Sequence, residues 1–147
     1  MGNLKFDKKG LEKLQKQLEE LEKGKARDKF FEDCAKEMAA RLLALVIPKT
    51  PVKSGNLRRG WTGGKKMDAE AFADSLTVKK SGKTYTITVE NNVEYASYVE
   101  YGHRTRGGKG FVQGKHMLET SEQELKALSP KILQDKLEKF LKGVLNG

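Results

Sequence analysis

The sequence predicts an α+β fold: a small antiparallel sheet packed against a long helix and a C-terminal helix, with an N-terminal helical extension. Two observations predict it. Residues 26–47 and 133–144 carry apolar side chains at helical spacing, whereas residues 84–91 alternate apolar and polar side chains, as a half-covered strand does. The length of 147 residues suits one domain with a short extension.

The chain is expected to divide into an N-terminal helical extension (1–24), an α+β domain (25–128) and a C-terminal helix (129–147). The extension holds a helix over residues 10–23, which would be marginal alone in water. Packing on its own domain and packing on a neighbouring subunit remain equally open. The stripe that predicts this helix consists of Leu11, Leu14, Leu18 and Leu21.

The long helix is predicted over residues 26–47 and is expected to supply the core. Pro48 disfavours helix at the residue before it, which places the end near Ile47. Cys34 lies on the apolar face and is interpreted as a small core residue; as the only cysteine, it allows no intrachain disulfide. The face is marked by Phe31, Cys34, Met38, Leu42 and Leu45, widened by Phe30, Ala35, Ala39 and Val46.

The sheet is predicted from three segments. Residues 75–80 and 84–91 form a hairpin that turns at Gly82, and residues 57–62 form an edge strand. Within the second strand, Tyr85, Ile87 and Val89 point to one face, which the long helix covers.

The C-terminal part is expected to be mostly helical. Tyr95, Tyr98 and Val99 are spaced as on a short helix, which Gly102 ends. Helix resumes near His116, and Ser129-Pro130 resembles the start of a separate last helix. The apolar face of that helix consists of Leu133, Leu137, Phe140, Leu141 and Val144.

The positive charge is concentrated in two glycine-rich loops. The chain carries a net charge of +9, of which residues 48–66 hold +6 and residues 102–116 hold +4, leaving −1 for everything else. Five glycines in the second loop make its order in the free chain doubtful.

The residue types that could support catalysis or bind metal or phosphate are not spaced as such sites require. The Gly82-Lys83-Thr84 triplet lacks the first glycine of a phosphate-binding loop, and Glu94 and Glu100 are not spaced as a catalytic pair. His103 and His116, the two histidines, do not make a zinc set with one distant cysteine. We therefore expect no enzyme, no catalytic or metal site and no cofactor. Since no stretch is apolar enough for a membrane span or a signal peptide, we expect a chain made in the cytoplasm that contacts no membrane.

The basic loops have two interpretations that composition leaves open. Trp61 and Phe111 could stack on bases while the loops contact phosphates. Equally, such loops serve as arms that dock on acidic protein surfaces.

Two longer segments favour the protein partner. One is Thr50-Pro-Val-Lys-Ser-Gly-Asn-Leu-Arg-Arg-Gly-Trp61, and the other is Val89-Glu-Asn-Asn-Val-Glu-Tyr-Ala-Ser-Tyr-Val-Glu-Tyr-Gly-His103. In this order, between a leading and a trailing helix, they resemble the tail-completion or head–tail joining family of tailed phages and prophages. His103 stands where that family usually has threonine, and residues 115–118 replace its usual Pro-Phe-Leu triplet.

The resemblance implies a virion structural protein that forms a ring, expected to be a hexamer, at the neck or the top of the tail. Its partners would be further copies of itself, the connector or adaptor, and the tail terminator or tail tube, with DNA contact secondary. The tail terminator itself is the alternative within the virion, and a basic DNA-binding packaging or regulatory factor is the alternative of another class.

The residues expected to serve assembly lie in the two segments and the second loop. Glu100 is expected to pair with Arg58 or Arg59, within or between subunits. The predicted assembly residues are Pro51, Gly55, Leu57, Arg58, Arg59, Trp61, Tyr98, Glu100, Gly102, His103, Arg104, Arg106 and Lys109.

Overall fold

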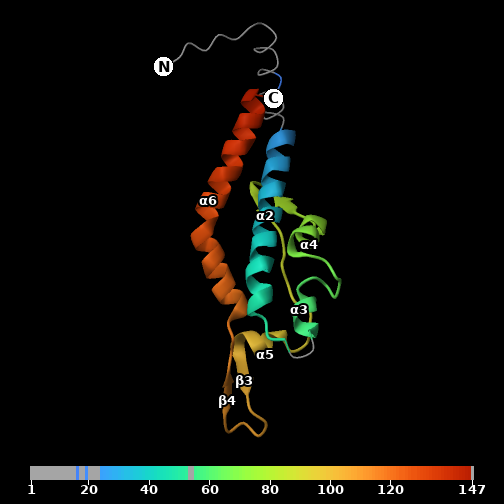
Figure 1. Ribbon diagram of the computed structural model, residues 1–147, viewed down its shortest axis with the longest axis vertical. Helices are drawn as coiled ribbons and strands as arrows, with labels where there is room; N and C mark the ends of the chain where they lie inside the picture. Colours follow the sequence, from blue (N-terminus) through green and yellow to red (C-terminus); the bar gives the residue numbers. More distant parts are fainter. Residues whose placement is uncertain (1–15, 17–18, 20–23, 53–54, 147) are drawn as a thin grey trace. The chain divides into compact units, whose positions relative to one another are not determined.

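The computed structural model describes residues 16, 19, 24–52 and 55–146 and confirms the α+β class (Figure 1). It divides into two compact units, Ala35–Pro130 and Met1–Cys34 with Lys131–Gly147. The predicted helix over residues 10–23 lies almost wholly outside the described residues, and the predicted boundaries at residues 24 and 128 stay predictions. The elements are α2 (Lys25–Lys49), α3 (Asn56–Gly60), α4 (Ala69–Ser75), β1 (Lys79–Ser81), β2 (Thr84–Thr86), α5 (Ala96–Tyr101), β3 (Gly102–Arg104), β4 (Phe111–Gln113) and α6 (Met117–Asn146).

Helix α2 supplies the core of the larger unit, as predicted, through a face that overlaps the predicted one. Ala39 and Val46 of the predicted face are buried, and so is Cys34, the predicted small core residue. Leu43, which was not predicted, is fully buried, whereas Phe31 is 40% exposed. Pro48 lies within the last turn instead of beyond the helix. The core combines this face with residues from three other places in the chain, namely α3 with its C-terminal end, α4 and α6. Its residues are Ala39, Leu43, Val46, Leu57, Trp61, Ala73 and Met117.

The chain after α2 is helical where the edge strand was expected. Residues 57–62 form α3 and the turns that follow it, so the predicted edge strand is wrong. A helical turn places Leu57 and Trp61, four residues apart, on one side, and both are buried in the core. Helix α4 follows, starting at Asp68, whose side chain accepts a hydrogen bond from the Ala71 backbone N–H at 2.7 Å.

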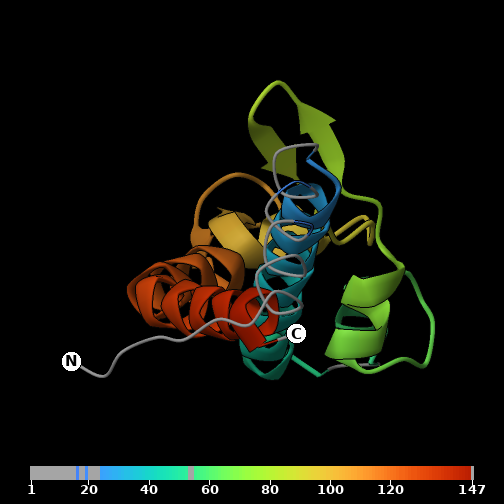
Figure 2. The same cartoon turned by 90° about the horizontal axis from the view of Figure 1, so that it is seen from above.

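The antiparallel strands form two separate hairpins rather than one sheet. Strands β1 and β2 pair Lys79 with Thr86 and turn at Gly82, as predicted, although the strands are shorter than expected and Ser75 belongs to α4. The alternation over residues 84–90 is confirmed, since Tyr85, Ile87 and Val89 are the less exposed set. Figures 1 and 2 show α4 and hairpin β1–β2 as two separate elements in the connection between α3 and α5.

Helix α5 matches the predicted short helix and ends at Gly102, which has a φ of 86°. The second glycine-rich loop, whose order was doubted, is a hairpin in which β3 pairs with β4, His103 opposite Val112 and Arg104 opposite Phe111. Its tip is closed by hydrogen bonds from the Thr105 N–H to the Gly110 carbonyl and from the Gly110 N–H to Thr105 Oγ1, both 2.9 Å.

Helix α6 runs without a break through Ser129-Pro130, so the predicted start of a separate helix there is wrong. Pro130 has no N–H to donate to the Lys126 carbonyl, one helical turn earlier. Ser129 replaces that donor, since its Oγ donates to the same carbonyl at 3.0 Å. The helix continues because a neighbouring side chain satisfies the acceptor that proline leaves free.

In the smaller unit, Phe30 stacks on Phe140 with ring centroids 4.6 Å apart. Both were placed on predicted apolar faces. Leu133, Leu137 and Leu141 of the same predicted face are 40–45% exposed. Within the described ranges, no helix is both long enough and apolar enough to cross a membrane.

Candidate functional site

The first family-like segment folds back on the end of α2 through Thr50. Thr50 Oγ1 donates to the Val46 carbonyl at 2.8 Å and accepts from Trp61 Nε1 at 2.9 Å. Arg58 Nε donates to the Thr50 carbonyl at 2.7 Å, and its Nη2 donates to the Pro48 carbonyl at 3.2 Å. Arg58 therefore donates to backbone carbonyls at the C-terminal end of α2, where such acceptors lack helical donors, and Trp61 donates to the Thr50 hydroxyl beside them.

The same segment is fixed from its other side by Asn91. Asn91 Nδ2 donates to the Leu57 carbonyl at 2.7 Å, while Asn91 Oδ1 accepts from the Val93 N–H at 3.1 Å. This joins α3 to the second family-like segment. A Cβ on Gly60 would lie 2.1 Å from Asn91 Oδ1, so the close approach requires glycine.

We expect Gly60→Ala to destabilise the protein by about 1–3 kcal/mol, because the added methyl displaces Asn91 and breaks its bond to Leu57. Urea denaturation measures the effect. Gly143→Ala is the control: a Cβ there meets nothing within 4 Å, so this helical substitution should be neutral or slightly stabilising. Equal stabilities of the two variants would contradict the close packing of Gly60.

Glu100 joins α5 to the start of α6. Its carboxylate is 5% exposed and accepts hydrogen bonds from the backbone N–H groups of Leu118 (2.7 Å) and Glu119 (3.0 Å). In return, the N–H groups of Lys115 and His116 donate to the Val99 and Glu100 carbonyls at 2.7 and 3.1 Å. Each helix end thus satisfies the other, and a negative charge lies at the positive end of α6.

This assigns Glu100 a role other than the predicted one. Both of its oxygens bind α6, and Arg58 binds carbonyl oxygens, so the two do not pair. Arg59 donates through Nη2 to Asn56 Oδ1 at 2.6 Å. Because Glu100 is buried, its carboxylate is also not accessible to an arginine of a neighbouring subunit.

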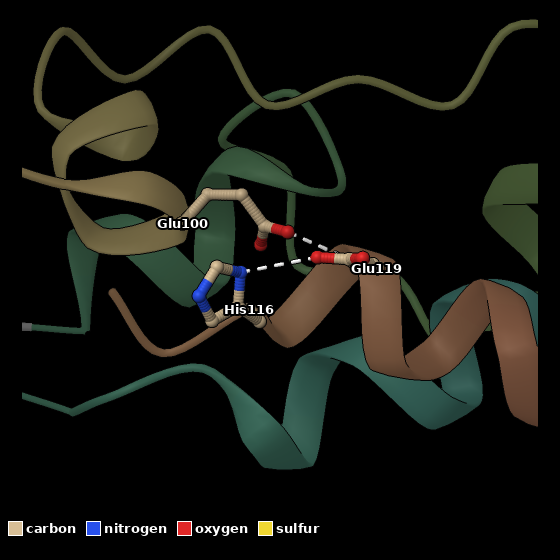
Figure 3. A group of neighbouring side chains, drawn as sticks. All are labelled: Glu100, His116 and Glu119. Carbon is tan, nitrogen blue, oxygen red and sulfur yellow. Dashed lines mark hydrogen bonds and ion pairs between the residues drawn. The ribbon is translucent and has the colours of Figure 1, made fainter. Parts of the chain in front are cut away.

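Figure 3 shows Glu100 pointing from α5 toward His116 and Glu119 at the start of α6. His116 Nδ1 lies 3.1 Å from Glu119 Oε2, and one ligand atom from each residue lies within 4.8 Å of the others. The fold therefore gathers a metal-ligand set that sequence spacing did not reveal. Yet Glu100 is already bound by two N–H groups, and the positive end of α6 opposes a cation. We assign the cluster to helix capping.

An apolar pocket of about 480 Å³ opens beside α5. It brings the two family-like segments and the β3–β4 hairpin to one place. Tyr98, which is 59% exposed, lies on its wall with its ring centroid 5.4 Å from that of His103. The lining consists of Pro51, Leu57, Tyr95, Tyr98, Val99, His103, Val112, Gln113 and Lys115.

The predicted assembly residues fall into three groups. Leu57, Trp61 and Glu100 are buried and hold the fold, and Gly55 and Gly102 take the positive φ of tight turns, 78° and 86°. Pro51, Tyr98 and His103 surround the pocket. The exposed basic residues outside it are Arg59, Arg104, Arg106 and Lys109, with Arg58 half-buried.

The sequence analysis missed three exposed apolar residues, of which Tyr95 and Val112 line this pocket. Tyr95, Val112 and Phe111 are 41%, 45% and 54% exposed. Phe111 had been considered only for base stacking. Their arrangement depends on the β3–β4 pairing, which a glycine-rich loop did not signal. Tyr95 and Val112, with the rest of the pocket lining, form a candidate surface for binding another protein, and Phe111, paired with Arg104, lies on the other face of the hairpin.

A family model described as "Bacteriophage HK97-gp10, putative tail-component" matches residues 12–102. The matched range contains the first segment that carries the resemblance and all of the second except His103. Searches of the curated proteins and of the solved structures found no match.

Proposed function

We propose that this chain, which belongs to the family of HK97-gp10-like bacteriophage tail components, joins the head to the tail of a phage or prophage particle. In this role it forms a hexameric ring at the neck or the top of the tail. The ring lies between the connector or adaptor and the tail terminator or tube. The chain acts by recognition and not by chemistry.

The observation that carries this proposal is the apolar surface beside α5. Tyr98 is 59% exposed on the wall of a pocket that both family-like segments line, and Tyr95 and Val112 of the same wall are 41% and 45% exposed. Exposed aromatic side chains around an apolar pocket are typical of protein-binding surfaces. Lys115 belongs to the lining, and the adjoining hairpin carries the exposed Arg104, Arg106 and Lys109, which suits an acidic partner.

The same geometry weakens the DNA-binding alternative. Trp61, one of the two aromatic residues considered for stacking on bases, is 3% exposed and donates its N–H to Thr50. It cannot stack on a base without leaving the core. The basic loops then offer phosphate contacts with Phe111 as the remaining aromatic of that pair.

The test is genetic. Deleting the gene from its phage or prophage should give filled heads and separate tails, because nothing joins them. Supplying the wild-type chain should restore joined particles, whereas Tyr98→Ala with Val112→Ala should restore at least about tenfold fewer, since two exposed side chains of the pocket wall are lost. Electron microscopy and infectious titre measure the result.

Matched controls separate this role from the alternatives. Phe31→Ala removes a 40% exposed aromatic side chain of α2 that is not among the pocket-lining residues, and should restore joining. Normal particles in the deletion strain would contradict the proposal. So would a gel shift of DNA at physiological salt by a chain that fails to co-sediment with heads or tails.

A further inference from the structure

The β3–β4 hairpin has an unpaired surface of its own. All three residues of β4 are exposed. Val112 lies on the face that lines the pocket, whereas Phe111, the preceding residue, lies on the opposite face with Arg104. Such a hairpin is marginally stable alone in water. Phe111 lies opposite Arg104, and Arg106 and Lys109 occupy the tip. The hairpin therefore presents an apolar side chain among positive charges.

A complementary surface lies on α4 of the same sequence. Residues 67–76 contain three acids and no base, the opposite of the hairpin. Glu70, Ala71 and Asp74 are exposed, while Phe72 and Ala73 pack toward the core. Glu70 and Asp74 are one helical turn apart and lie on one face, with the small Ala71 beside them. This outer face of α4 therefore presents two carboxylates next to the small apolar side chain of Ala71.

The carboxylates of α4 remain available for a partner. Lys36 Nζ lies 3.9 Å from Asp74, but the Asp74 side chain is 81% exposed, so that contact is weak. The first turns of α6 are also acidic, but Glu119 and Glu124 are paired at closer range, with His116 at 3.1 Å and Lys49 at 3.2 Å, which leaves Glu122 as a single exposed carboxylate there against two on α4. Helix α4 is therefore the better acceptor for the hairpin.

We propose that the β3–β4 hairpin of one subunit docks on the outer face of α4 of a second copy. Phe111 covers Ala71, and Arg104 and Lys109 pair with Asp74 and Glu70. In Figure 1 the hairpin projects beyond α5, with α3 and α5 between it and α4. Two different patches on one chain make a head-to-tail contact, which closes into a ring when the rotation permits. This inference rests on the proposed ring and names its contact.

Cysteine cross-linking tests which surfaces meet. Lys109→Cys protein is mixed with Ala71→Cys protein and a short bismaleimide. We expect their heterodimer to form at least about tenfold faster than with Lys83→Cys, which places the same change at the tip of hairpin β1–β2. Native Cys34 is buried, and the wild type gives the background rate. Equal rates for the two tips, or faster homodimers of Lys109→Cys, would overturn the contact.

Charge reversal tests the pairing independently. Arg104→Glu with Lys109→Glu, and separately Glu70→Lys with Asp74→Lys, should each lose the self-association that the wild type shows at low salt. Mixing the two variants should restore it, because each reversed hairpin then meets an α4 of opposite charge. Sedimentation velocity measures association. A wild type that stays monomeric at low salt, or a mixture that stays monomeric, refutes the proposal.

The outcome is separable from the proposed function. If either charge-reversed variant alone still restores head–tail joining in the deletion strain, the ring contact is wrong while the joining role stands. If the mixture associates but the deletion strain makes normal particles, the contact stands and the joining role is wrong.

Discussion

Replacing Trp61 with alanine should destabilise the protein by about 3–5 kcal/mol, the largest effect expected of any single substitution here. Trp61 is 3% exposed in the core, and its N–H donates to Thr50. The change leaves a cavity between α2 and α3 and removes a donor from a buried hydroxyl. Trp61→Phe keeps most of the ring and should cost about 1–2 kcal/mol for the lost hydrogen bond and the smaller volume.

Urea denaturation measures these losses, and Trp61 is the only tryptophan, so its emission also reports the core directly. Native emission should be blue-shifted and weakly quenched by iodide. Tyr98→Ala is the matched control: Tyr98 is 59% exposed, so stability should change by less than about 0.5 kcal/mol. A native emission spectrum like that of free tryptophan, or a Trp61→Ala protein as stable as Tyr98→Ala, would show that Trp61 is not a core residue.

Glu100→Ala should destabilise the protein by about 2–3 kcal/mol, because two backbone N–H groups at the start of α6 lose a charged acceptor in a buried place. Glu100→Gln keeps one acceptor oxygen and should cost less. Hydrogen exchange should show the loss locally, as faster exchange of the Leu118 and Glu119 amides. These two amides distinguish a helix cap from a general loss of packing.

Glu122→Ala removes an exposed carboxylate from the same helix and should leave both stability and those amides nearly unchanged. If Glu100→Ala behaves like this control, Glu100 does not cap α6. If Glu100→Ala keeps its fold but fails only in particle joining, Glu100 acts at an interface, as the sequence first suggested.

Local sequence patterns predicted the structure correctly where a single residue determines the backbone conformation. Gly82 and Gly102 take positive φ values of 60° and 86°, and they end the elements that they were expected to end. The alternation from Thr84 to Glu90 also survives in the pattern of exposure. Helix α4 carried a signal that was overlooked, since Asp68 precedes a run of good helix formers and caps it.

Pro130 shows why a local rule failed. Ser129-Pro130 has the pattern of a helix start, but the same serine can also satisfy the carbonyl that proline leaves free. The choice between these two roles depends on the turns before it, where Met117 and Ser121 are buried. Packing of the preceding turns carries the helix through a sequence that could have begun a new one.

The sequence by itself determined the α+β class, the two basic segments, and the resemblance to phage tail components, because each follows from composition, periodicity or residue order. Only the tertiary structure decided which residues of those segments are free to bind. Leu57, Trp61 and Glu100 turn inward because α2, Asn91 and α6 supply partners for them from distant parts of the chain. Tyr98, Phe111 and the hairpin arginines are left outside because nothing in their own chain covers them among the described residues.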